Sequence, residues 1–150
     1  MRAFYNPSLG LLVLRLGLGI IFMAHGAQKL FGWFGGAGIE GTAGFFASLG
    51  IPAPEILAWV VAILEVFGGL LVILGMFTRV IPAFLAIDVT VALFTVHLPA
   101  GFFVKPQGPD GIEFVLIMAV ASLTLAFSGA GAYSLDAKRE GPTGAEAVPI

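Results

Sequence analysis

Residues 56–74 read ILAWVVAILEVFGGLLVIL, a run in which Glu65 is the single charged side chain. A helix of about 20 apolar residues is long enough to cross the hydrocarbon core of a bilayer. Three further runs are similarly apolar, over residues 9–31, 80–98 and 112–127. Backbone groups in lipid must hydrogen-bond within their own segment, and none of the runs alternates as barrel strands do. Each run is therefore predicted to be a transmembrane helix.

The composition of the whole chain agrees with this prediction. Of its 150 residues, 59% are hydrophobic and 11% are charged, whereas soluble domains carry about 25% charged residues. We predict an all-α integral membrane protein, a bundle of four transmembrane helices in one domain over residues 1–136. Its net charge of −2 gives no reason to expect a nucleic-acid partner. The absence of cysteine excludes thiolate metal sites built by this chain alone.

The segments outside the four runs have their own signatures. Residues 32–50 are rich in glycine and too short to span, so they predict a short interfacial or re-entrant helix, with Trp33 as an interface anchor. Residues 137–150 mix charge, Gly and Pro and are predicted to be disordered. Arg15 interrupts the first apolar run, which argues against a cleaved signal peptide.

Lysine and arginine residues in short loops indicate which side of the membrane each loop faces. Four spans place both termini on one side, together with the connection between the second and third helices. That side carries Arg2, Arg79, Lys138 and Arg139, and the other side carries Lys29 and Lys105. We therefore expect a plasma-membrane protein whose termini are cytoplasmic.

Ionisable side chains lie within or at the ends of the predicted spans, where inserting each one costs about 2.5–3.5 kcal/mol. They are Arg15, His25, Lys29, Glu65, Asp88, His97 and Glu113. At about 100° per residue, Arg15 and Lys29 lie within about 40° of each other on the first helix, and His25 lies within about 80° of Arg15. One face of this helix is therefore polar and is predicted to face the bundle interior.

Depth along the helices divides these residues into two layers. The central layer is predicted to pair Arg15 with Glu65 or Asp88, beside the small residues Gly68 and Gly69. Such a pair either fixes helix register or handles protons or a ligand, and both readings stay open. The outer layer contains the remaining ionisable residues. Within it, snorkelling of Lys29 and a first-turn position for Glu113 are sufficient structural explanations.

The two histidines of the outer layer, His25 and His97, need another explanation. Axial ligation of haem is one alternative, and it is less favoured because the spacing forms no motif. A metal site with Glu113 or Glu65 as third ligand likewise forms no motif, so no metal is predicted. A quinone fits better, because its carbonyl oxygens require donors, a carboxylate relay and aromatic walls. Donors and walls of these kinds are present, and they include Lys29, Gln28 and Trp33.

Several motifs resemble those of the DoxX family when they are taken together and in order. They are Arg15, HGAQKLFG at 25–32, LGIP at 49–52, Glu65 with Gly68 and Gly69, LGMFTR at 74–79, His97 with GFF at 101–103, and GAGAYSLD at 129–136. The resemblance implies a four-helix membrane protein that works in redox settings. Family members are linked to quinone-coupled thiosulfate oxidation, to a terminal quinol oxidase, to complexes that detoxify oxidants and to responses to catechols and quinones.

The leading hypothesis is a quinone-interacting subunit of a membrane oxidoreductase. The catalytic candidates are His25, His97, Lys29 and Glu65, and the cofactor-binding candidates are Arg15, Gln28, Trp33, Asp88 and Glu113. The alternative is a non-catalytic membrane anchor that recruits soluble redox enzymes. A small-solute transporter is less favoured, because no inverted repeat is visible. Four helices enclose a site only narrowly, so a homodimer is a further expectation.

Overall fold

The structure is a computed structural model that describes residues 6–105 and 110–140. These residues are helical, without a strand. The helices are α1 (Pro7–Phe31), α2 (Gly38–Ser48), α3 (Pro54–Leu74), α4 (Ile81–Ala92), α5 (Glu113–Ser128) and α6 (Leu135–Glu140). A 3₁₀ turn, η1 (Trp33–Gly35), follows α1. A π-helical turn, η2 (Leu93–His97), and a 3₁₀ turn, η3 (Leu98–Ala100), prolong α4.

The predicted four-helix membrane bundle is confirmed. Three helical stretches are long and apolar enough to cross a membrane, Pro7–Phe31, Pro54–Leu74 and Ile81–Ala100, and the shorter Glu113–Ser128 is also apolar. The outward faces suit lipid, since Ile20, Ile87 and Ile117 are each about 60% exposed. The predicted short helix after the first span is present as α2. Residues 137–140, predicted to be disordered, belong to α6, and the rest of that tail lies outside the described residues.

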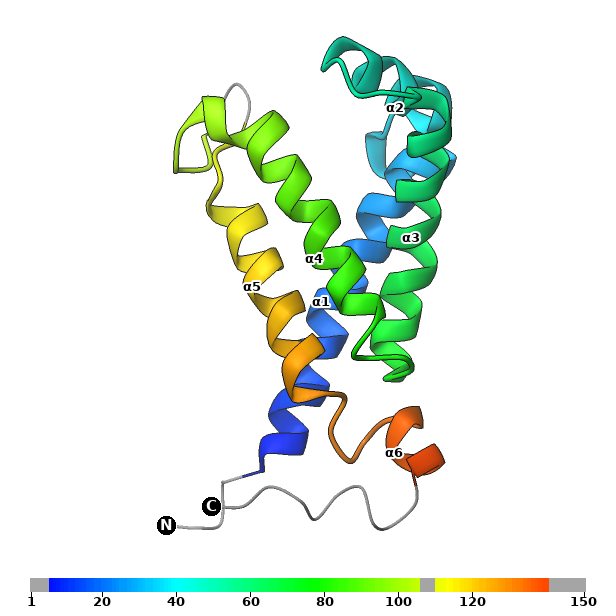
Figure 1. Cartoon of the computed structure of the whole chain (residues 1–150), viewed down its shortest axis with the longest axis vertical. Helices are drawn as coiled ribbons and strands as arrows, with labels where there is room; N and C mark the ends of the chain where they lie inside the picture. The colour runs from blue at the N-terminus through cyan, green and yellow to red at the C-terminus, as the bar shows by residue number, and fades with distance from the viewer. Residues whose placement is uncertain (1–5, 106–109, 141–150) are drawn as a thin grey trace.

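The four long helices form two pairs, as Figure 1 shows. One pair is α1 with α3, and the other is α4 with α5. The start of α1, the turn between α3 and α4, and α6 lie at one end of the bundle, which we call the terminal end. At the other end, the distal end, lie α2 and the turn after α4, and the two pairs diverge toward it. The side chains of the shared core are Leu18, Phe22, Val72, Leu85, Val89, Met118, Ala119 and Leu125.

Glycines let the backbones of α1 and α3 touch. A Cβ atom at Gly19 would lie 2.6 Å from the Gly69 carbonyl oxygen, and one at Gly26 would lie 2.6 Å from the Val66 nitrogen. A Cβ atom at Gly69 would in turn lie 2.7 Å from the Gly19 carbonyl oxygen. Small residues at such positions are typical of close helix packing in membranes. The predicted packing role therefore holds for Gly69, whereas a Cβ at Gly68 would make looser contacts with α4.

Candidate functional site

Three charged side chains from three helices meet inside the bundle. Lys29 Nζ of α1 donates to Glu65 Oε2 of α3 at 2.6 Å, and the Glu65 side chain is only 6% exposed. Asp88 of α4 faces the same pair. A Cβ at Gly68, one turn from Glu65, would lie 3.5 Å from the side chain of Leu85, one turn from Asp88, and the Asp88 carboxyl group is close enough to interact with Glu65 and Lys29. We call these residues the Lys29–Glu65–Asp88 cluster. It contains two of the predicted catalytic residues and one predicted cofactor-binding residue.

The glycine contacts between α1 and α3 position this cluster. Gly26 lies one turn before Lys29, and a Cβ there would also come within 2.9 Å of the Glu65 Cβ. The two backbones are therefore close enough for the Lys29 side chain to reach the buried carboxylate. The ammonium group of Lys29 bonds to Glu65 and does not simply reach toward the head groups, so the prediction that it only snorkels is wrong. Its side chain remains 26% exposed.

Arg15 does not belong to this cluster, and the predicted pairing of Arg15 with Glu65 or Asp88 is wrong. Its guanidinium group instead donates to two backbone carbonyls near the terminal end, Ala130 at 2.7 Å and Tyr133 at 2.5 Å. The side chain is 1% exposed. Arg15 therefore ties α1 to the segment that follows α5, and its role here is architectural.

Asp136 anchors the same segment to the turn between α3 and α4. Its carboxylate accepts hydrogen bonds from the Phe77 and Thr78 backbone nitrogens, at 3.0 and 2.9 Å, and from Thr78 Oγ1 at 2.7 Å. Burial alone would raise the pKa of Asp136, but the bonds from Thr78 and Phe77 and the nearby Arg139 charge outweigh it, so the pKa is lowered. The sequence pattern at 129–136 gave no indication of this contact.

Asp136→Asn is expected to destabilise the protein by about 1 kcal/mol at pH 7, because a charged hydrogen-bond acceptor is lost. A lowered folded-state pKa means that the carboxylate contributes its stability above the ordinary value of about 3.9 and loses it as pH falls through the folded-state pKa. The wild type should therefore approach the variant in stability as the pH falls below about 4. Thermal unfolding in detergent across this range measures the difference. Asp110→Asn, at an exposed residue, is the control, and an equal effect of both substitutions would contradict the expectation.

The two histidines lie near each other toward the distal end. His25 of α1 interacts electrostatically with His97 and with Lys29, and its ring centroid is 5.9 Å from that of Phe114 on α5. His97 is the last residue of the π-helical turn η2, and its Nδ1 atom is 2.8 Å from the Asp110 carbonyl oxygen. π-Helical turns occur frequently at functional sites. His25 thus lies within electrostatic range of both His97 and Lys29.

The remaining candidates have local structural partners. Gln28 Nε2 donates to the Phe34 carbonyl oxygen at 3.4 Å, and the exposed Trp33 ring lies 4.9 Å from that of Phe31. Glu113 Oε1 accepts from the Val104 nitrogen at 2.5 Å and so closes the connection into α5. Across residues 6–105 and 110–140, no three His, Asp or Glu side chains gather as a metal site would require.

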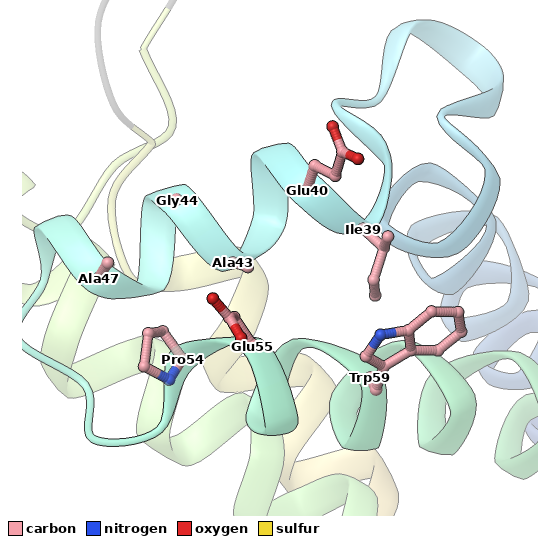
Figure 2. A pocket seen from close by; sticks show the side chains of 8 residues that line it. All are labelled: Ile39, Glu40, Ala43, Gly44, Ala47, Pro54, Glu55 and Trp59. Carbon is pink, nitrogen blue, oxygen red and sulfur yellow. The ribbon is translucent and has the colours of Figure 1, made fainter.

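A surface cavity of about 500 Å³ lies apart from these groups, between α2 and the start of α3 (Figure 2). It is lined by Ile39, Glu40, Ala43, Gly44, Ala47, Pro54, Glu55 and Trp59. None of the candidates from the sequence lines it. We place the candidate site at the Lys29–Glu65–Asp88 cluster and the histidines that adjoin it, because buried charged groups such as Glu65 in a membrane interior mark functional positions more specifically than a surface hollow does.

Comparison with known proteins gives the chain its family. The DoxX family model matches residues 10–98. A Bacillus subtilis protein named "Putative oxidoreductase CatD" is 36% identical over 129 residues, 86% of each chain. The Escherichia coli inner membrane protein YphA is 34% identical over 84% of this chain and 87% of its own, and an uncharacterized membrane protein of Mycobacterium tuberculosis is 34% identical over 82% and 77%. No solved structure matches significantly. The family model matches more than half of this chain, and these relatives share at least 34% identity with it over most of its length. The chain therefore belongs to the DoxX family.

Proposed function

We propose that this protein is a quinone-interacting subunit of a membrane oxidoreductase. The observation that carries the proposal is the electrostatic interaction between two histidines from different helices, His25 of α1 and His97 of η2, toward the distal end. The printed name of the Bacillus subtilis relative supports an oxidoreductase setting. Together they favour a site for a lipophilic ligand that exchanges protons.

The chemistry of a quinone suits these side chains. Its two carbonyl oxygens accept hydrogen bonds and take up protons when the ring is reduced, and a neutral imidazole can donate one hydrogen bond and accept another. Phe114, 5.9 Å from the His25 ring, offers an aromatic surface for a planar ring. We assign His25 to one quinone oxygen and His97 to the second oxygen or to proton relay.

Binding of decylubiquinone and of menadione to the purified protein tests this assignment. His25→Ala and His97→Ala are each expected to weaken binding about tenfold, the equivalent of losing one hydrogen bond of about 1.4 kcal/mol. Thr95→Ala is the matched control, because Thr95 lies in the same π-helical turn and bonds to the Val91 carbonyl oxygen of its own helix. Unchanged binding in both histidine variants would overturn the site.

The alternative role, a membrane anchor for soluble redox enzymes, is favoured by one observation. α6 forms an ordered helix at the terminal end, with Lys138 and Arg139 exposed. We place this end on the cytoplasmic side, because it also carries Arg79, whereas the loop after η3 at the distal end carries Lys105. Unaltered quinone binding in the histidine variants would favour the anchor, and a Soret absorbance band in the purified protein would favour the haem alternative.

A further inference from the structure

The Lys29–Glu65–Asp88 cluster has more acidic groups than basic ones. Two carboxyl groups and one ammonium group carry a net charge of −1 when all three are ionised. Glu65 is buried, and Asp88 and Lys29 are partly buried, within the membrane-spanning part of the bundle. An uncompensated charge in such a place is costly, because neither water nor a counterion solvates it fully. One added proton makes the cluster neutral.

The contact between the two carboxyl groups also requires a proton. Ionised carboxylates only accept hydrogen bonds, so a hydrogen bond between two carboxyl groups needs one of them to be protonated. Glu65 and Asp88 face each other from α3 and α4, close enough for their carboxyl groups to interact, while Lys29 Nζ lies 2.6 Å from Glu65 Oε2. Like-charged carboxylates that share a site do not both ionise readily.

We infer that Lys29, Glu65 and Asp88 form a proton-binding site that holds one proton between its two carboxyl groups at neutral pH. The site joins three helices, because Lys29 is on α1, Glu65 on α3 and Asp88 on α4. The proton is taken up when the neutral cluster forms and is released when a positive charge or a proton acceptor reaches the carboxyl pair. The inference goes beyond the proposed quinone site and does not require a quinone to be bound.

The charged and titratable groups around the cluster come from the helices packed against it. On α1, His25 interacts with Lys29, and beyond it His97 lies at the end of η2. On α5, Glu113 is held by the Val104 nitrogen. Arg15 is hydrogen-bonded near the terminal end, 14 residues before Lys29 on α1 and so about 21 Å away. His25, one turn before Lys29 on α1, is thus a proton acceptor that interacts with Lys29, and it connects the proton site to the proposed ligand position.

Infrared spectroscopy of the ligand-free protein at pH 7.5 tests the inference directly. Exposed carboxyl groups have pKa values near about 4 and are ionised at this pH, so a protonated carboxyl C=O band reports the buried site. A maltoside detergent contributes no carbonyl band. The wild type is expected to show about one protonated carboxyl per chain. A spectrum without this band would overturn the inference, even if no variant could be purified.

The inference predicts a different number of protonated carboxyl groups for three variants. Glu65→Gln and Asp88→Asn each leave one carboxylate facing one ammonium group, so the band is expected to disappear in both. Lys29→Met removes the cation, so both carboxyl groups are expected to be protonated and the band to double. Glu55→Gln, an exposed carboxyl at the start of α3, is the control and should leave the band unchanged.

The result that would contradict the inference is a band that persists in both amide variants, or one that does not grow in Lys29→Met. A purely structural ion pair predicts no band in the wild type and therefore differs from the expected result. The measurement is also independent of the histidines. Loss of quinone binding in the histidine variants with no infrared band would support the proposed function and refute the proton site, and the reverse pattern would do the opposite.

Discussion

Replacing Arg15 by methionine is expected to lower the free energy of unfolding by about 3–5 kcal/mol, the largest loss among the substitutions considered. The guanidinium group is 1% exposed and donates to the Ala130 and Tyr133 carbonyl oxygens at 2.7 and 2.5 Å. Methionine fills part of the volume but leaves the buried Ala130 carbonyl and the partly buried Tyr133 carbonyl without this donor. Each unsatisfied buried acceptor costs about 1–3 kcal/mol.

Unfolding of the purified protein in detergent by increasing fractions of sodium dodecyl sulfate measures this loss. Arg79→Met makes the same chemical change at an exposed residue in the turn between α3 and α4, and it is expected to stay within about 0.5 kcal/mol of wild type. Arg15→Lys should fall between the two, because one ammonium group lacks the fork that reaches two carbonyls. Equal stability of Arg15→Met and Arg79→Met would refute the role assigned to Arg15.

Gly19→Ala is expected to destabilise the protein by about 2–3 kcal/mol through overpacking. The added methyl group would lie 2.6 Å from the Gly69 carbonyl oxygen and 2.6 Å from the Ile73 Cγ1 atom. Backbone atoms of α3 cannot rotate away as a flexible side chain could, so α1 and α3 must separate. The separation would also lengthen the contact between Lys29 and Glu65, which spans the same helix pair.

Gly17→Ala provides the control on the same helix, two residues away. No atom lies within 4 Å of a Cβ built at Gly17, and alanine forms helix better than glycine by about 1 kcal/mol. This substitution is therefore expected to be neutral or stabilising in the same detergent unfolding experiment. If Gly19→Ala and Gly17→Ala had effects of the same sign and size, the backbone contact between α1 and α3 would not be the cause.

Much of the fold could be predicted because each membrane-spanning helix is a continuous run of apolar residues in the sequence. The observed helical stretches start and end within a few residues of the four apolar runs. Two of these helices end at a glycine, α1 at Gly32 and α3 at Gly75, with positive φ angles of 71° and 67°. The small residues beside Glu65 also pointed correctly to close packing at Gly69.

The partner of Glu65 could not be predicted, because hydropathy does not report how far antiparallel helices are offset. Gly26 lies opposite Val66. From this crossing α1 continues only five residues to Phe31, about 7.5 Å, whereas α3 began twelve residues earlier at Pro54, about 18 Å away. α3 therefore extends farther toward the distal end than α1 does. Counting depth from each helix end placed Lys29 too far out and Arg15 too close to Glu65.

The partners of Arg15 were missed for a different reason. The predicted partners of Arg15 were carboxylates, whereas its guanidinium group binds the backbone carbonyls of Ala130 and Tyr133. Every residue has such a carbonyl, so no side-chain type identifies the partners of Arg15. The glycines of the GAGAYSLD motif at 129–136 were the one indirect signal, since a glycine-rich segment can expose its carbonyls to a neighbouring helix.

The contact made by Arg15 has a consequence for how the protein is synthesised. Arg15 enters the membrane with the first helix, but Ala130 and Tyr133 follow 115 and 118 residues later. Ribosomes synthesise the N-terminal part of a chain first, so the guanidinium group is in the membrane before its hydrogen-bond partners have been synthesised. It lies eight residues after Pro7, about 12 Å from the helix start, and a long arginine side chain can reach head groups or water from there. α1 is thus inserted before α5, but its contacts with Ala130 and Tyr133 form only after α5 has left the ribosome.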